Sequence, residues 1–186
     1  MKPTPPQGDG PRRPARSPLF DRMRAQHAYV LQALAVLERA LAAAPAPGAR
    51  SGIRIADLRV LVNELGRELA AHVSEEDEVL MPLLASGLPE GPGFVRGLVA
   101  EHAELRAMLV AFAATLDRPE GAQRDEQIGV QGGDLIALTR LQIRKEETLV
   151  FAIAERLIAP GAPAPRSSGR REAPPSRPHP TRGEPS

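Results

Sequence analysis

Four stretches of the sequence carry apolar residues at the three- and four-residue spacing of an amphipathic helix. They cover about residues 19–44, 53–84, 93–117 and 126–158. Segments containing proline or glycine separate them, and the alternation of apolar and polar residues that marks a strand is nearly absent. Amphipathic helices joined by short or moderate loops bury their apolar faces by packing antiparallel. We therefore expect an all-α chain folded as an up-down-up-down four-helix bundle.

The same periodicity predicts details inside the helices. The apolar stripe of the second stretch is expected to run on through Val79, and that of the fourth through Leu149 and Ile153. Proline lacks a backbone N–H and clashes with the preceding turn, so Pro82 is expected to close or kink the second helix.

Prolines also mark the limits of the folded part. Of the 20 prolines, 14 fall within residues 1–18 and 160–186, which are rich in Pro, Arg, Gly and Ser. Segments with so few large apolar side chains cannot offset the entropy lost on ordering. We expect two disordered tails around one folded domain at residues 19–159.

Several polar residues interrupt the apolar stripes. These are His27, His72 and His102 on three different helices, and Glu76 and Glu146 on two. His72 and Glu76 are four residues apart and so share one helix face, a spacing that Gln142 and Glu146 repeat. Burying two carboxylates without partners costs several kcal/mol each, so a bound cation is the economical explanation. Imidazole and carboxylate ligands suit iron, manganese or zinc.

These residues also carry a family resemblance. The segments Gln26-His27, His72-Val-Ser-Glu-Glu76-Asp-Glu-Val-Leu-Met-Pro82, Glu101-His102 and Gln142-Ile-Arg-Lys-Glu146-Glu147 resemble the motifs of the haemerythrin-like (HHE) domain. The resemblance implies a non-haem di-iron centre inside the bundle, with the two glutamates bridging the metals. His27 and His72 would cap one metal, and His102 and residue 142 the other. Members of the family bind dioxygen, peroxide or nitric oxide, and some act in nitrosative stress.

Two residues depart from the family pattern. Gln142 stands where the family has histidine, and a glutamine carbonyl binds iron more weakly than imidazole, so the second metal should be labile. Arg106 stands where oxygen-carrying members have a further histidine. Its guanidinium either turns inward to pair with Glu76 or Glu146 and competes with metal, or extends to solvent.

Three functions follow as hypotheses. The first is an iron protein holding one or two ions that binds or senses a small diatomic ligand, oxygen or nitric oxide, in a redox or nitrosative stress response. The second is a metal-poor bundle acting as a structural or protein-interaction module, and the third a mononuclear zinc or manganese site. All three are binding proteins rather than enzymes.

Composition excludes other classes. The chain has no cysteine, which removes disulfides and thiolate ligands. No module that reads nucleic-acid bases is present, and no apolar run is long enough to span a membrane. No apolar run follows the basic residues of the N-terminus, so we expect no secretory signal and a cytoplasmic location.

Overall fold

The computed structural model describes residues 17–43 and 55–159, and within these ranges it contains helices and no strand. The first helix is α1 (Pro18–Ala42). The second consists of α2 (Ile55–Glu75), the π-helical turn η1 (Glu76–Leu80) and α3 (Met81–Gly87). The third is α4 (Gly91–Leu116). The fourth consists of α5 (Ala122–Lys145), the π-helical turn η2 (Glu146–Val150) and α6 (Phe151–Ile158).

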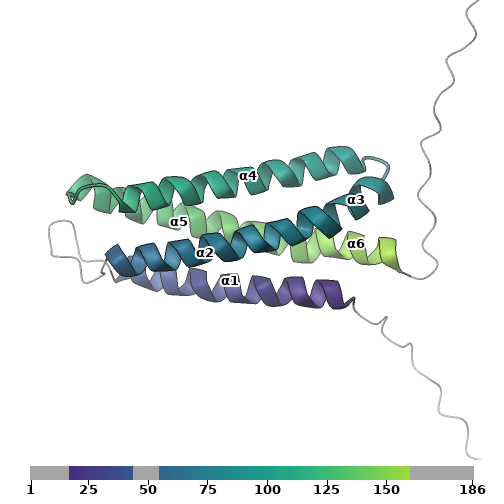
Figure 1. The fold of residues 1–186 in the computed structure, drawn as a ribbon, viewed down its shortest axis with the longest axis horizontal. Helices are drawn as coiled ribbons and strands as arrows, with labels where there is room; N and C mark the ends of the chain where they lie inside the picture. The colour runs from purple at the N-terminus through teal and green to yellow at the C-terminus, as the bar shows by residue number, and fades with distance from the viewer. Residues whose placement is uncertain (1–16, 44–54, 160–186) are drawn as a thin grey trace, which may run out of the picture.

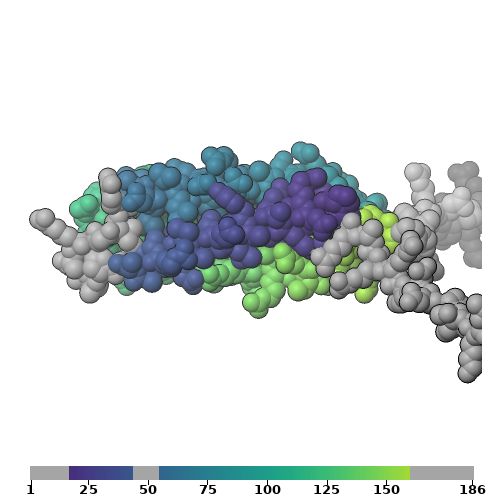
Figure 2. All heavy atoms as spheres, turned by 90° about the horizontal axis from the view of Figure 1, so that it is seen from below, coloured from purple at the N-terminus to yellow at the C-terminus, as the bar shows by residue number. Residues whose placement is uncertain are grey.

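The four helices form the expected bundle (Figure 1). α1 packs against α2 and α5, α4 packs against the same two helices, and α3 packs against α6. Figure 2 shows the outer face of α1 along the molecule, with the C-terminal helix beside it in green and yellow. Apart from Ser17 and Pro18, the predicted tails lie outside the described residues, as does the predicted start of the second helix at residue 53.

The apolar core has two separate parts. The larger part joins the halves of the helices nearest the connection between α1 and α2, and includes Leu34, Leu65, Phe112 and Leu135. The smaller part lies at the α3 and α6 end, and includes Phe20, Leu84, Leu98 and Phe151. On each long helix, polar residues stand between the residues of the two parts. The functional residues predicted from the sequence therefore fall in one layer across the bundle.

The two π-helical turns change which residues face the core. The N–H of Met81 donates to the carbonyl of Glu76, five residues back, and the N–H of Phe151 donates to Glu146 in the same way. This wider turn shifts the buried face by about one residue relative to an α-helix. The prediction that Val79 and Leu149 lie in the core was wrong, because they are 43% and 45% exposed.

The residues that replace them follow directly in the sequence. Leu80 and Val150 are fully buried in the smaller core part, as is Ala154, whereas the predicted Ile153 is only partly buried. Pro82 does not close the helix, which continues to Gly87. Pro82 lies in the first turn of α3, where its fixed φ fits and a missing N–H is tolerated.

Gly91 allows the close approach of α4 to the end of α3. A Cβ at this position would meet the backbone carbonyl oxygens of Leu84 and Ala85, the latter at 2.5 Å. Backbone cannot move aside as a flexible side chain can, so Gly91→Ala should lower the free energy of unfolding by roughly 1–3 kcal/mol. Urea denaturation of the purified protein measures this change.

Gly97 on the same helix provides the matched control. A Cβ there would meet no atom within 4 Å. Gly97→Ala should therefore raise the free energy of unfolding by about 0.5–1 kcal/mol through helix propensity alone. Equal effects of the two substitutions would contradict the close approach at Gly91.

Candidate metal centre

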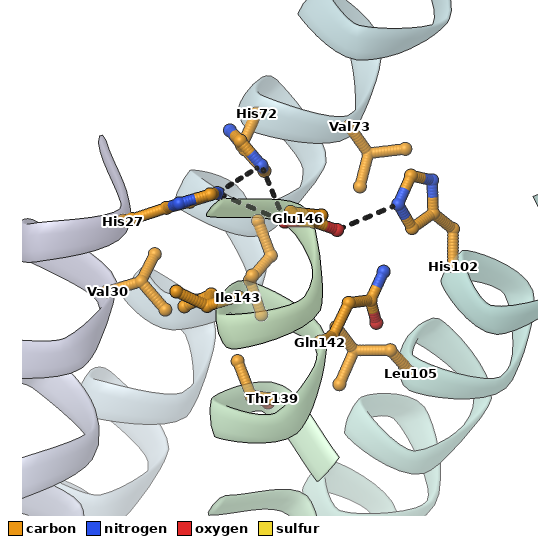
Figure 3. A pocket seen from close by; sticks show the side chains of 11 residues that line it. His27, Val30, His72, Val73, His102, Leu105, Thr139, Gln142, Ile143 and Glu146 are labelled. Carbon is orange, nitrogen blue, oxygen red and sulfur yellow. Dashed lines mark hydrogen bonds and ion pairs between the residues drawn. The ribbon is translucent and has the colours of Figure 1, made fainter. Parts of the chain in front are cut away.

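Five polar side chains meet in the layer between the two core parts (Figure 3). His27 comes from α1, His72 from α2, His102 from α4, Glu76 from the first residue of η1 and Glu146 from the first residue of η2. Each is at most 4% exposed. They form two clusters of possible metal ligands: the two-histidine cluster of His27, His72 and Glu146, and the one-histidine cluster of Glu76, His102 and Glu146.

In the two-histidine cluster the inner nitrogens of the rings converge. His27 Nε2 lies 3.0 Å from His72 Nε2, and Glu146 Oε2 lies 3.1 Å from the former and 3.7 Å from the latter. The outer nitrogens have acceptors: His27 Nδ1 is 3.0 Å from Glu147 Oε1, and His72 Nδ1 is 2.8 Å from Gln26 Oε1. An acceptor on each Nδ1 selects the tautomer protonated there, so in the neutral rings two Nε2 lone pairs face each other. A cation between them removes that repulsion.

In the one-histidine cluster, His102 Nε2 lies 3.2 Å from Glu76 Oε2 and 3.5 Å from Glu146 Oε1. The other oxygen of Glu76, Oε1, lies 3.6 Å from His72 Nε2. Each glutamate therefore turns one oxygen to the ring of His102 and the other toward the pair of histidines. Carboxylates placed in this way can bridge two ions.

Several buried polar atoms of the layer lack a well-oriented hydrogen bond. They are both carboxylate oxygens of Glu76, both ring nitrogens of His102 and the side-chain oxygen of Gln142. His102 and Glu76 are close enough to attract as an ion pair, but their orientation does not make a hydrogen bond. Unsatisfied buried groups of this kind cost free energy. Nitrogen and carboxylate donors together fit iron, manganese or zinc.

The charges of the layer shift its pKa values. Burial disfavours the charged ring of His102, but the carboxylates of Glu146 and Glu76 outweigh burial and raise its pKa to about 9. The pKa of His27 is also raised, because Glu146 and Glu147 outweigh the opposing effect of burial. Burial opposes ionisation of Glu146, yet the three histidines lower its pKa. Without metal, protons on the histidines are the counter-charge of the carboxylates, so a metal must compete with protons.

Two further residues from the sequence analysis lie at the edge of the layer. Gln142 is 7% exposed and lines the same pocket as His102 and Glu146, and Figure 3 shows its amide between these residues and Leu105. Arg106 is exposed, and no ion pair found in the described parts of the chain joins it to Glu76 or Glu146. The structure therefore shows the solvent-facing one of the two orientations considered for Arg106.

Sequence reasoning missed the residues that hold the histidines from outside. Gln26 and Glu147 were part of the motifs but had no assigned role, and Phe151, which stacks on the His27 ring at 5.4 Å between centroids, was not singled out. One signal was available: Gln26 and Glu147 adjoin His27 and Glu146 in sequence, and so lie on the flank of the same inward face.

Comparison with known proteins agrees with this geometry. The model of the family described as Hemerythrin HHE cation binding domain matches residues 19–154. No curated protein and no solved structure compared with the chain gave a match. A search of the helices in residues 17–43 and 55–159 for a segment long and apolar enough to cross a bilayer found none.

The raised pKa of His102 predicts how the stability of the metal-free protein depends on pH. Below the ordinary histidine pKa of 6.5 the stabilising charge is fully present, and it is lost as the pH rises through about 9. With a chelator present, the free energy of unfolding should fall between these pH values by up to about 3 kcal/mol. Glu146 acts in the opposite direction, because its contribution is lost as the pH falls below the ordinary value of 4.5.

Urea denaturation at constant ionic strength across this pH range measures the alkaline loss. His102→Leu removes the titrating ring and should leave a clearly smaller loss, to which His27 still contributes. An unchanged slope in His102→Leu would contradict the assignment to His102.

Proposed function

Since the chain belongs to the haemerythrin HHE cation binding domain family, we propose that it binds non-haem iron, as one or two ions, in the layer across its bundle. The ligands in this proposal are His27, His72, Glu76, His102 and Glu146, with Gln142 as a weak sixth. We further propose that the iron binds a small diatomic ligand, oxygen or nitric oxide, in a redox or nitrosative stress response in the cytoplasm. The protein would act by binding rather than by catalysis.

The observation that carries the proposal is the convergence of His27 Nε2 and His72 Nε2 at 3.0 Å beside Glu146. The tautomers set by Gln26 and Glu147 leave both nitrogens as acceptors, an arrangement that suits a shared cation. Iron fits this donor set, and the family makes it the expected metal. Bound iron would supply the open coordination position at which a diatomic ligand binds.

The chain itself supplies position and a dry environment. The pocket beside the ligands has an apolar wall formed by Val30, Leu69, Val73, Leu105 and Ile143. Such a wall admits a small, weakly polar molecule and excludes bulk water from the ligand atoms. The carboxylates hold negative charge in the layer, which balances the charge of the metal.

Gln142 supports the second candidate function, a metal-poor bundle that serves as a structural or interaction module. Its side-chain oxygen is buried without a hydrogen-bond partner, so it neither completes the layer nor is solvated. If the weaker ligand lowers the affinity enough, the protonated histidines would replace metal as the counter-charge. Zinc or manganese in place of iron is the remaining alternative.

Metal content decides between these functions. After anaerobic loading with ferrous iron and desalting, the wild-type chain should retain one or two irons by elemental mass spectrometry. His72→Ala removes a ligand that faces both clusters and should lower the retained iron by at least tenfold, with helicity by circular dichroism preserved. Wild-type protein that retains zinc or manganese instead, or no metal, would contradict the iron proposal.

Gln142→His restores an imidazole beside the one-histidine cluster. Because imidazole is the better iron ligand, this variant should retain closer to two irons per chain than the wild type. Gln123→His, at an exposed position of α5, is the matched control and should leave the iron content unchanged. No gain in Gln142→His would contradict the placement of residue 142 at the second metal.

A further inference from the structure

The two histidines of the two-histidine cluster are held from outside by side chains that adjoin ligands in the sequence. Gln26 precedes His27 on α1, and its Oε1 accepts a hydrogen bond from His72 Nδ1 on α2 at 2.8 Å. Glu147 follows Glu146 in η2, and its Oε1 accepts from His27 Nδ1 at 3.0 Å. Each ring is thus fixed by a residue of a different helix.

The orientation of Gln26 is itself determined. Its Nε2 donates to Glu75 Oε2 at 2.9 Å, and Arg22 Nε donates to Glu75 Oε1 at 2.6 Å. A carboxylate accepts only from the amide nitrogen, so the oxygen of Gln26 must face His72. This chain of three side chains therefore sets the His72 tautomer and directs its Nε2 inward.

The His27 ring has two supports of its own. Besides the carboxylate of Glu147, the ring of Phe151 stacks on it with an angle of 7° between the planes. Phe151 is fully buried and packs against Phe20 in the smaller core part, so it forms a rigid backing. Both the tilt and the tautomer of His27 are therefore defined before any metal binds.

The one-histidine cluster has no comparable support in the parts of the chain that the structure describes. His102 Nδ1 is buried with no hydrogen-bond partner, and no aromatic ring stacks on His102. The neighbouring Gln142 offers an oxygen that nothing orients. Partners that hold the far nitrogen of a metal-binding histidine raise metal affinity by about 10- to 100-fold.

We propose that Gln26 and Glu147 are positioning residues that prepare the two-histidine cluster to bind the first ferrous ion, so that the one-histidine cluster binds the second ion more weakly. The two ions are then taken up in a fixed order. The inference rests on the proposed function and adds to it which cluster fills first and which outer residues decide this. Glu147 acts through His27, and Gln26 acts through His72.

An anaerobic titration with ferrous iron, followed by calorimetry, tests the order. The wild type should bind two equivalents of unequal affinity. Gln26→Leu and Glu147→Ala should each weaken the tighter equivalent by about 10- to 100-fold and leave the weaker one little changed. Glu147→Gln keeps an acceptor for His27 Nδ1 and should retain most of the affinity, a rescue that a merely structural role would not produce.

Matched controls separate positioning from general effects on charge or folding. Glu104→Ala and Gln123→Leu change exposed residues of the same types and should titrate like the wild type. Glu147 is 38% exposed, so Glu147→Ala provides a folded variant even where Gln26→Leu disturbs packing, and circular dichroism checks both. Wild-type titration curves for both Gln26→Leu and Glu147→Ala would overturn the inference.

His102→Ala identifies which cluster holds which equivalent. It should lose the weaker equivalent and keep the tighter one. Loss of the tighter equivalent in His102→Ala, or two equal equivalents in the wild type, would overturn the order while leaving iron binding intact. A wild type that binds no ferrous iron would instead overturn the proposed function, and this inference with it.

Discussion

The structure depends on one constraint, the burial of two carboxylates and three imidazoles in a layer that crosses an otherwise apolar core. Charged groups away from water need a counter-charge, and here each carboxylate finds it in the rings around it. Because each of the four long helices places a polar residue in the layer, the helices must keep a common register along the bundle. The apolar parts on either side maintain that register, as Leu65 and Phe112 pack on one side and Leu84 and Phe151 on the other.

Much of this could be predicted from the sequence, because helical periodicity fixes which residues face inward. His27, His72 and His102 lie in line with buried leucines, so both the bundle and the meeting of these rings followed from spacing alone. The two π-helical turns could not be predicted in this way. A turn widened by one residue leaves composition unchanged, and the periodic pattern pointed to Val79 where the structure buries Leu80.

The outer residues of the site were beyond the sequence for a different reason. Gln26 and Glu147 lie on the flanks of their helices, where polar side chains are normally solvated, and their role depends on a ring carried by another helix. Arg106 occupies a similar flank, and its long side chain could reach either side. Spacing along one helix carries no information about such choices, because the distances between helices decide them.

The widened turns also tie the site to the rest of the protein across generations. Glu76 and Glu146 each begin one of these turns, and the residues after the turns, from Met81 and Phe151 onward, build the smaller core part. Loss of one residue just after either glutamate would close the turn and rotate the following helix by about 100°. That rotation would take Leu84 or Ala154 out of the core. Selection for a packed core thus preserves the length of these segments, and with it the position of the glutamates, even in a descendant that no longer needs them as ligands.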